Sequence, residues 1–412
     1  MKVIVIGAGA AGCFCAIQLK RLMPTAEVVI YEAGRRPLMK VAITGGGRCN
    51  LTNSFEAIGN LSEAYPRGAQ LMKRALSVFD QNDICQWFEN EGVPVVLQDD
   101  HCVFPESQDA MQIVNTLLHL LRKHGVQVHC SHKATLIEEG YRVTLAGADG
   151  ALTTAEADFV VVTTGGSPKA RGFAMLEPLG LEIVPPVPSL FTLNIPGQGL
   201  TDLMGAVVEN ATAKIAGTKF SASGPLLLTH WGASGPAILK LSSYGARFLA
   251  ECQYCTSIIL NWLGDANEED AKQLLQELAS KYPSRQCSSV YPEVLSSRLW
   301  LHILQRSGIR EDMRWAEMGR KGLARLASTL VCDTYQTRGR GHFKEEFVTC
   351  GGVSLSEISL KTLEAKKHPR LYFGGEVLDV DAITGGFNLQ AAWSMGFVIA
   401  QSIAEKMKDE TK

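Results

Sequence analysis

The 412-residue sequence predicts an α/β fold in which a Rossmann-like domain is interrupted by a β-rich and helical insertion. Three observations predict it. A glycine-rich turn directly follows an apolar, β-type run at the N-terminus. Glycine pairs beside short apolar runs return from residue 345 to the C-terminus. Between these regions, short alternating segments give way to helical periodicity, so we expect the middle of the chain to be an insertion.

The N-terminal turn has the composition of a dinucleotide-binding site. Gly7-Ala8-Gly9-Ala10-Ala11-Gly12 stands between the apolar run of residues 2–6 and a helical pattern over residues 13–22. Gly7 permits a tight turn, Gly9 lets the backbone approach a pyrophosphate, and Gly12 lets the helix pack on the strand. Ala10 and Ala11 open that helix, whose free N–H groups favour phosphate. Glu32, about twenty residues further on, is placed to bind a ribose diol and disfavours a 2′-phosphate.

The composition excludes several classes of protein. The formal net charge of −2 argues against a nucleic-acid partner held by bulk electrostatics. No apolar run reaches the roughly eighteen residues of a membrane span, and no export signal precedes the first apolar run. We therefore expect a cytoplasmic protein without a membrane or nucleic-acid partner. The nine histidines show no metal-binding spacing on a helix, so no metal site is expected.

The eleven cysteines, an odd number in such a chain, are expected to be reduced thiols. Cys252-Gln253-Tyr254-Cys255 has the spacing of a redox or zinc pair. It lacks a second ligand pair and leads into the apolar run Ile258-Ile259-Leu260. We therefore favour a strand with buried thiols, and the redox pair stays open as the alternative.

Proline and periodicity divide the chain. Pro185-Pro186-Val187-Pro188 is expected to continue neither helix nor sheet and to mark a boundary. The predicted nucleotide-binding domain consists of residues 1–187 and 345–412. Residues 188–344 form a predicted cap, which is β-rich over 188–262 and helical over 263–330.

Polar and glycine-rich residues run from the turn to Pro66. Beyond them we expect one helix over residues 68–91, a helix capped by Ser107, a long helix after Gly385-Gly386, and short strands over residues 93–97, 126–129, 134–137, 141–145 and 159–164.

Four further regions carry a resemblance to a known family. They are Lys40 to Asn53 (KVAITGGGRCNLTN), Leu226 to Pro236 (LLLTHWGASGP), Phe347 to Val353 (FVTCGGV), and Gly374 to Asp381 (GGEVLDVD) followed by Thr384 to Gln390 (TGGFNLQ). With them the chain resembles, over nearly its whole length, the BaiN-like flavoproteins, a bacterial family also known as aminoacetone-oxidase-family FAD-binding enzymes. After Thr164-Gly165-Gly166-Ser167 that family commonly continues with a tyrosine and a glycine-rich run, whereas Pro168 follows here. This departure leaves the shape of the adjoining loop, and with it substrate choice, open.

The resemblance implies a two-dinucleotide-type FAD-binding domain. No histidine or cysteine stands in a covalent-linkage motif, so the FAD is expected to be noncovalent. Beside the N-terminal turn and Glu32, the residues implied to bind it are Lys40, Thr44, Gly46, Gly47, Arg48, Asn50, Thr52, Ala134, Thr164, Gly165, Gly166, Gly375, Glu376, Asp379, Gly386, Phe387, Asn388, Leu389 and Gln390.

Residue chemistry agrees with several of these implied contacts. Glycines before Arg48 leave backbone N–H groups open to a pyrophosphate or a flavin edge, and the guanidinium can neutralise phosphate. The helix start at Gly386 can aim N–H groups at the flavin. Glu376 and Asp379 can orient ribityl hydroxyls, although Asp379 is equally well an ordinary loop acid, and Ala134 equally well a plain strand residue.

Two side chains are candidate catalytic residues. Cys49 stands between Arg48 and Asn50, in an electropositive loop that is expected to lower its pKa, but no resolving cysteine is nearby. His230, next to Trp231 in the insertion, could protonate a substrate carbonyl or carbanion. A structural histidine is the alternative. We expect the insertion, residues 188–343, to roof the flavin and set substrate choice.

The resemblance implies an FAD-dependent oxidoreductase that moves a hydride between flavin N5 and a small organic substrate. The implied reaction is reduction of a conjugated enone, with NAD(P)H as electron donor. A second NAD(P)-type glycine turn is not found, so a nicotinamide would enter the substrate cleft itself. The alternatives are an amine oxidase that produces hydrogen peroxide, and a flavin-dependent RNA-modifying or regulatory protein. The last is disfavoured because acids interleave with the basic residues over 310–325, as on a solvated helix face.

Overall fold

The computed structural model describes residues 1–340 and 348–410. The chain divides into two compact units: unit 1 is Met1–Val187 with Val348–Lys412, and unit 2 is Pro188–Phe347. The chain thus leaves unit 1 after Val187. The expected return at residue 345 lies outside the described residues. Among the helices of the described ranges, none is both long and apolar enough to cross a membrane.

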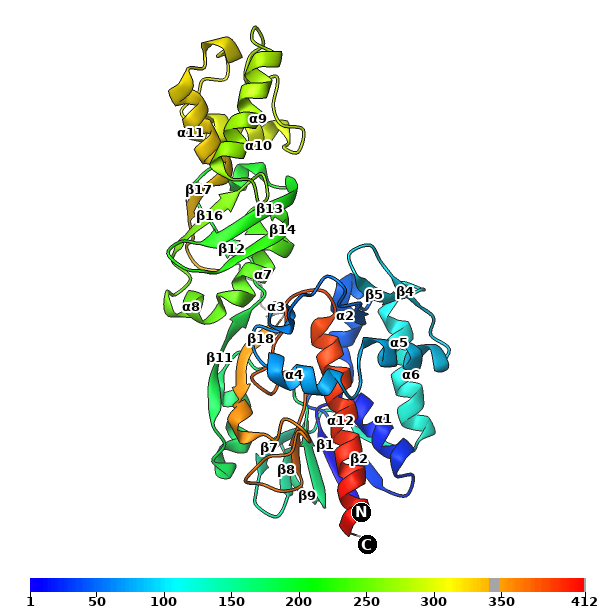
Figure 1. Cartoon of the computed structure of the whole chain (residues 1–412). Coiled ribbons are helices and arrows are strands. Elements are labelled where there is room, and N and C mark those ends of the chain that lie inside the picture. Colours follow the sequence, from blue (N-terminus) through cyan, green and yellow to red (C-terminus); the bar gives the residue numbers. More distant parts are fainter. Residues whose placement is uncertain (341–347, 411–412) are drawn as a thin grey trace. The chain divides into compact units, whose positions relative to one another are not determined.

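Unit 1 is built on a five-stranded sheet with the order β19-β10-β1-β2-β6. Figure 1 labels two of its strands, β1 and β2. Every pairing in this sheet is parallel. All four residues of β10 are buried, as expected for a parallel strand covered on both faces. The predicted α/β fold with a Rossmann domain is confirmed. The strands of this sheet are β1 (Lys2–Ile6), β2 (Glu27–Tyr31), β6 (Gln127–His129), β10 (Phe159–Val162) and β19 (Leu371–Phe373).

Smaller sheets and a set of helices complete unit 1. The small sheets have the orders β3-β5-β4, β7-β8-β9 and β11-β18. Their strands are β3 (Thr52–Asn53), β4 (Val95–Leu97), β5 (Cys102–Pro105), β7 (Lys133–Ile137), β8 (Arg142–Ala146), β9 (Leu152–Glu156), β11 (Ile183–Ser189) and β18 (Val348–Val353). The helices are α1 (Ala10–Leu22), α2 (Met39–Gly47), α3 (Leu61–Ala64), α4 (Ala69–Leu76), α5 (Gln81–Asn90), α6 (Ala110–Lys123), the 3-10 segments η1 (Ala170–Leu179) and η4 (Leu355–Glu357), and α12 (Phe387–Glu410).

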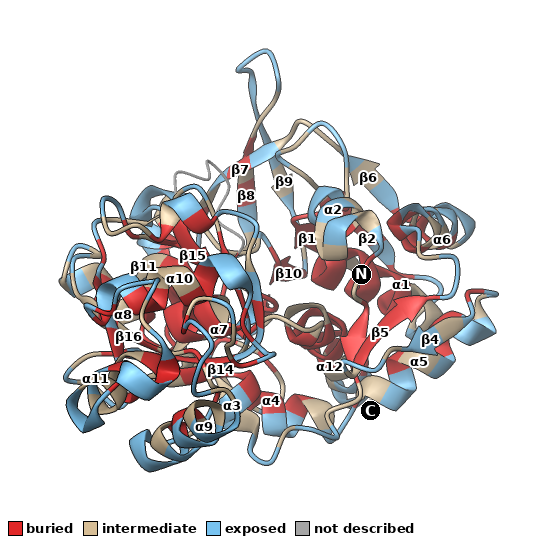
Figure 2. Ribbon diagram, turned by 90° about the horizontal axis from the view of Figure 1, so that it is seen from above, coloured by how far each residue is buried: buried red, intermediate tan, exposed pale blue. Residues whose placement is uncertain are grey.

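The long C-terminal helix α12 is packed against α1. Gly396 allows this close approach, because a Cβ there would lie 2.8 Å from the carbonyl oxygen of Ala11. Buried residues recur along α12 from Phe387 to Ala404 (red in Figure 2). The predicted terminal helix is therefore confirmed, and its apolar residues form part of the core of unit 1.

Unit 2 contains a six-stranded antiparallel sheet with the order β12-β15-β14-β13-β16-β17. The strands are β12 (Leu193–Asn194), β13 (Val207–Ile215), β14 (Ser221–Leu228), β15 (Gly232–Ser234), β16 (Ser257–Asn261) and β17 (Asp333–Gln336). The helices are η2 (Thr201–Leu203), α7 (Pro236–Tyr244), α8 (Ala246–Glu251), α9 (Glu268–Lys281), α10 (Ser297–Arg306), η3 (Trp315–Glu317) and α11 (Arg320–Val331).

The first half of unit 1 differs from expectation at three places. The single helix over 68–91 is two helices, because the side chain of Asp80 accepts hydrogen bonds from the N–H groups of Asn82 and Asp83 and begins a new helix there. Helix α6 is capped by Asp109, not Ser107, since the Asp109 carboxylate accepts from Met111 N at 2.8 Å. Helix α2 lies within the stretch before Pro66, for which we expected only polar, glycine-rich chain.

Two other expectations are wrong. The run Pro185 to Pro188, which we expected to continue neither helix nor sheet, lies in strand β11, and among the described strands β11 pairs only with β18. Proline is tolerated on such an edge strand because one side of it donates no ladder hydrogen bond. Cys252 and Cys255 do not lie in a strand with buried thiols. They flank a turn between α8 and β16, where Cys255 is exposed and Cys252 is half-buried.

A buried carboxylate joins the helical part of unit 2 to its sheet. Asp333, at the start of β17, has a side chain that is 1% exposed. It accepts hydrogen bonds from Arg306 Nε (2.6 Å), Tyr335 OH (2.6 Å) and Trp262 Nε1 (3.0 Å). The three donors satisfy a charge that would otherwise be costly to bury.

We predict that Asp333→Ala lowers the free energy of unfolding of unit 2 by about 3–5 kcal/mol, because it leaves the Arg306 guanidinium and two other donors without their buried acceptor. Urea unfolding followed by tryptophan fluorescence measures the change. Asp312→Ala is the matched control: this exposed carboxylate pairs with Arg310 at 3.3 Å and should contribute less than about 0.5 kcal/mol. Equal effects of the two substitutions would contradict the assignment.

Candidate functional site

The N-terminal glycine turn connects β1 to α1 with the geometry that its sequence predicts. Gly7 has φ of +105°, and its N–H donates to the carbonyl oxygen of Tyr31 at 2.8 Å. A Cβ on Gly12 would lie 2.1 Å from the carbonyl oxygen of Gly7, so only glycine lets the helix approach the strand so closely. At Gly9, by contrast, a Cβ would have no atom of the described residues within 4 Å. The space in front of Gly9 and the N-terminus of α1 is therefore open.

Thr163 supports this turn and was not predicted from the sequence. It is buried at the end of β10, and its hydroxyl lies within hydrogen-bond distance of the carbonyl oxygens of Ile6 (3.1 Å) and Gly7 (3.0 Å). The only signal in the sequence is its place directly before Thr164-Gly165-Gly166. Thr163 is best described as a positioning residue for the turn.

Glu32 closes β2 as expected and is held in place by two backbone groups. Its Oε2 accepts from Ala8 N at 2.7 Å and its Oε1 from Gly34 N at 2.6 Å. Each carboxylate oxygen keeps a second lone pair, so the group remains able to accept from the two hydroxyls of a ribose.

The loop that contains Gly45, Gly46 and Gly47 is an interrupted helix end. All three glycines have positive φ, between 59° and 85°, and a Cβ on Gly46 or Gly47 would have no described atom within 4 Å. This side-chain-free stretch has open space in front of it, like Gly9. Arg48, at its end, donates to the carbonyl oxygen of Gly45 at 3.2 Å and stacks on the ring of Phe104 at 4.3 Å. Arg48 is therefore exposed, and these two contacts fix the orientation of its guanidinium group.

The expectation for the pKa of Cys49 is wrong. The Cys49 side chain is fully buried, and burial raises the pKa of its thiol to about 12. The cause is desolvation of the thiolate. Cys49 therefore lacks the thiolate that redox catalysis requires.

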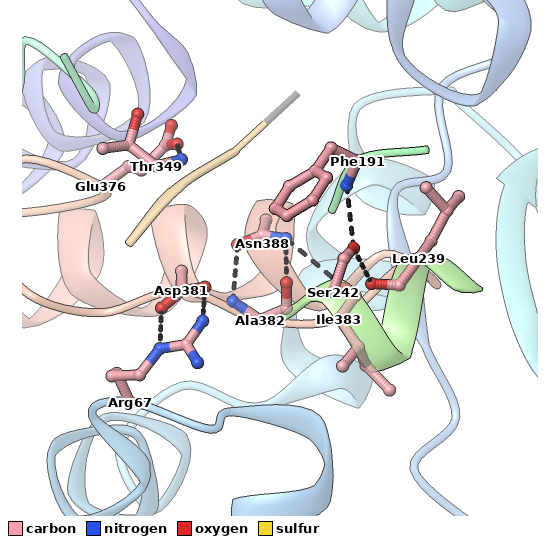
Figure 3. A network of polar contacts seen from close by, with 10 residues as sticks. All are labelled: Arg67, Phe191, Leu239, Ser242, Thr349, Glu376, Asp381, Ala382, Ile383 and Asn388. Carbon is pink, nitrogen blue, oxygen red and sulfur yellow. Dashed lines mark hydrogen bonds and ion pairs between the residues drawn. The ribbon is translucent and has the colours of Figure 1, made fainter. Parts of the chain in front are cut away.

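A second part of the site joins three segments that are far apart in the sequence. Glu376, after β19, accepts from Thr349 N at 2.7 Å (Figure 3) and from Lys40 Nζ at 3.1 Å. A Cβ on Gly166 would lie 2.8 Å from Glu376 Oε1. The predicted residues Lys40, Gly166 and Glu376 are thus brought together, and Glu376 has a structural partner in the backbone of β18.

The start of α12 is held by buried polar contacts. Thr52 donates to Gln390 Oε1 at 2.6 Å, and Tyr65 donates to the carbonyl oxygen of Phe387 at 2.9 Å. Asn388 accepts from Ala382 N at 3.0 Å and donates to the carbonyl oxygen of the same residue at 3.1 Å (Figure 3). The side chains of Thr52, Asn388 and Gln390 are therefore engaged with the protein itself. The backbone N–H groups at this helix start remain suited to a ligand.

Arg67 and Asp381 form a further contact that the sequence did not predict. Both guanidinium nitrogens that face Asp381 donate to its fully buried carboxylate (Figure 3). The pair joins the chain before α4 to the chain before α12. Nothing in the sequence pattern connects two residues separated by 314 positions.

Unit 1 contains all the residues implied to bind FAD. Gly375 lies beside the first turn of α1, since its Cβ would be 3.4 Å from that of Ala11. Ala134 is buried on β7, where it pairs with Leu145. Gly165 follows β10 and lies near Lys40, since a Cβ on this glycine would be 3.9 Å from Lys40 Nζ.

His230 belongs to unit 2. It is exposed at the tip of the β14–β15 hairpin, where its ring lies 4.4 Å from that of Trp231, so it is not a buried structural histidine.

The residues of unit 1 fit FAD. Gly9, Gly46 and Gly47 line open space that a Cβ would enter, which suits a pyrophosphate at close range. The N-terminus of α1 has free N–H groups for its charge, and Glu32 has lone pairs for the ribose. In the described part of the chain, no group of three or more His, Cys, Asp and Glu side chains could hold a metal ion.

The fold and this glycine-lined site define an FAD-binding oxidoreductase with a discontinuous Rossmann domain. The chain belongs to the HI0933-like protein Rossmann domain family, whose model matches residues 1–402. The resemblance to BaiN-like flavoproteins is thereby confirmed.

Individual relatives cover the whole chain. The ribosomal RNA dihydrouridine synthase of Escherichia coli is 31% identical over 412 residues, 97% of each chain. The 3-dehydro-bile acid delta(4,6)-reductase of Clostridium scindens is 26% identical over 98% of this chain and 99% of the relative. The solved structure of 3-ketosteroid delta1-dehydrogenase from Sterolibacterium denitrificans aligns with a TM-score of 0.51 at 12% identity, over 98% of this chain and 99% of that one. The last similarity shows a shared fold.

We predict that Glu32→Ala weakens FAD binding by about 1–3 kcal/mol, because the ribose hydroxyls lose a charged acceptor and Ala8 N loses its partner. Flavin fluorescence on dilution of the yellow holoenzyme measures the dissociation constant. Glu27→Ala is the control: this exposed residue begins β2, the strand that Glu32 follows, and pairs with Lys2 at 3.1 Å. Unchanged affinity in Glu32→Ala would show that the nucleotide site is misplaced.

Gly9→Val and Gly12→Val should fail in different ways. Because Gly9 faces open space and has φ of −83°, Gly9→Val should fold but lack FAD. Gly12→Val should not fold, because the side chain would overlap the backbone of Gly7. Circular dichroism and the flavin-to-protein absorbance ratio separate these outcomes. Full flavin content in Gly9→Val would contradict the assignment.

Proposed function

We propose that the protein reduces a carbon–carbon double bond conjugated to a carbonyl group, with NAD(P)H as electron donor. The observation that carries this proposal is the reaction shared by full-length relatives whose named substrates differ. Formation of dihydrouridine saturates a uracil double bond next to a carbonyl. A 3-dehydro-bile acid delta(4,6)-reductase likewise saturates double bonds conjugated to a ketone. Both reactions need a hydride at the β-carbon and a proton at the α-carbon.

FAD, when bound, supplies hydride chemistry at its N5. The chain's own residues have the complementary tasks. The first turn of α1 and the glycines of residues 45–47 would hold the phosphates, and Glu32 the adenosine ribose. Glu376, fixed by Thr349 N and Lys40, would orient the ribityl hydroxyls. The N–H groups at the start of α12 would stabilise negative charge on the reduced cofactor.

His230 is the proposed proton donor. It is an exposed imidazole, a side chain that can act as a general acid. Cys49 is unsuited to this role, since its buried thiol has a pKa of about 12. A proton from a His230 ring nitrogen would complete the reduction at the α-carbon.

Two substrates present such a bond. A small cyclic enone agrees with the small-molecule substrate implied by the resemblance. A uracil base in ribosomal RNA is the second candidate, favoured by the 31% identity to the E. coli enzyme over 97% of both chains. The net charge of −2 would not itself attract RNA, so an RNA substrate would depend on local contacts.

One anaerobic assay tests the reaction class and distinguishes the substrates. The holoenzyme is mixed with NADH or NADPH and either an unsaturated 3-ketosteroid or ribosomal RNA transcribed without modifications. We expect nicotinamide oxidation that depends on one substrate, and a product heavier by two hydrogens. Failure with both substrates, together with rapid reoxidation of reduced flavin by oxygen, would favour the amine oxidase instead.

We predict that His230→Ala keeps its FAD but lowers turnover roughly tenfold or more, because the general acid is lost. The matched control is His119→Ala, which removes another exposed histidine, on α6. Turnover is measured with saturating substrate over a range of pH values, beside the flavin content of each variant. Unchanged turnover at every pH would leave the proton donor unassigned.

A further inference from the structure

The CxxC motif in unit 2 forms a tight turn with accessible thiols. Cys255 N donates to the carbonyl oxygen of Cys252 at 3.0 Å, which closes a four-residue turn. Gln253 and Tyr254, at its centre, have φ of 52° and 60°. Two central residues with positive φ are typical of a type I′ turn, in which the outer Cα atoms lie less than about 7 Å apart. A disulfide needs Cα atoms about 4.4–6.8 Å apart, so the turn brings the two cysteines within bridging range.

Residues outside the turn hold it in this conformation. The carbonyl oxygen of Tyr254 accepts from Gly339 N at 3.1 Å and from Thr337 Oγ1 at 2.9 Å. The Tyr254 ring packs edge-on against Phe191, with ring centroids 5.4 Å apart. Non-glycine residues adopt positive φ persistently only where the surroundings impose it. The two thiols are therefore kept close together without a bond between them.

The accessibility of the two thiols suits a stepwise oxidation. Cys255 is exposed and Cys252 is half-buried, whereas Cys13, Cys15, Cys49, Cys102, Cys287 and Cys350 are buried. An exposed thiol with a second thiol three residues away has the arrangement of an attacking and a resolving cysteine. Structural zinc would need four ligands, and no group of three or more candidate ligands occurs in the described ranges.

We propose that Cys252 and Cys255 are a reversible redox modification site, oxidised to a disulfide by hydrogen peroxide. The Cys255 thiolate attacks one peroxide oxygen, the O–O bond breaks, and a sulfenic acid and water form after proton uptake. The Cys252 thiolate then attacks the sulfenic sulfur. The S–S bond forms, the S–O bond breaks, and the hydroxide leaves as a second water. Two thiols are oxidised and one peroxide is reduced, and a dithiol reductant reverses the change.

Peroxide treatment of the full-length holoenzyme tests this site. We expect a mass loss of two hydrogens, loss of two alkylatable thiols, a disulfide mapped to Cys252 and Cys255, and recovery with dithiothreitol. In Cys252→Ser the sulfenic acid cannot be resolved. Its labelling by dimedone at Cys255 should then rise at least tenfold over wild type. Cys332→Ser, which removes the other exposed cysteine, is the control and should behave as wild type.

Three results would overturn the proposal. One is that both thiols remain alkylatable after peroxide. Another is that Cys255 proceeds to sulfinic acid while Cys252 stays reduced. The last is that either cysteine bridges to a different partner. A Cys255 variant that misfolds would also fail to form the disulfide. We therefore compare Cys255→Ser with Cys255→Ala and measure the flavin absorbance of each to show that it is folded.

Discussion

Unit 1 depends on the close approach of α1 to the ends of β1 and β10 at Gly12. A Cβ there would lie 2.1 Å from the Gly7 carbonyl oxygen and 2.5 Å from the Thr163 hydroxyl. This approach brings the N-terminus of α1 to the carboxyl edge of the parallel sheet, where nucleotides bind in such folds. It also sets the surface on which α12 packs at Gly396. The site and the core of unit 1 therefore share one steric constraint.

Buried polar contacts then tie the two ends of the chain together. Thr52 to Gln390, Tyr65 to Phe387, and Arg67 to Asp381 each join an N-terminal segment to the C-terminal one. A typical hydrogen bond contributes only about 1 kcal/mol, but a buried donor or acceptor left unpaired costs more. The contacts therefore favour one alignment of α12 against the N-terminal segments. Since the glycine loop of α2 leads directly into Thr52, that alignment also positions the loop.

In flavoenzymes the cofactor supplies the redox chemistry, and the protein supplies binding, orientation and electrostatics. The protein offers backbone N–H groups, one carboxylate that is proposed to bind the ribose, and an ion pair, while burial raises the pKa of its thiol near the glycine loop. This explains how relatives with one fold can have named substrates as different as ribosomal RNA and a bile acid. In the proposed function the hydride chemistry would come from the cofactor, and substrate choice would depend on other parts of the chain.

Local rules were enough to predict much of this protein from its sequence. Gly7, Gly9, Gly12 and Glu32 follow from the spacing of a strand, a turn and a helix, and the terminal helix follows from its apolar period. The contacts of Thr163, Arg67 and Asp381 could not be predicted, because they depend on which distant segments meet. The same holds for the pKa of Cys49, which is set by burial and not by its charged neighbour, and for the CxxC pair, whose turn is imposed by Thr337 and Gly339.

The sequence by itself determined the fold class and the nucleotide turn, because both depend on local backbone geometry. The tertiary structure decided which polar side chains are consumed by packing and which remain free for chemistry, because burial and long-range pairing exist only in the folded chain.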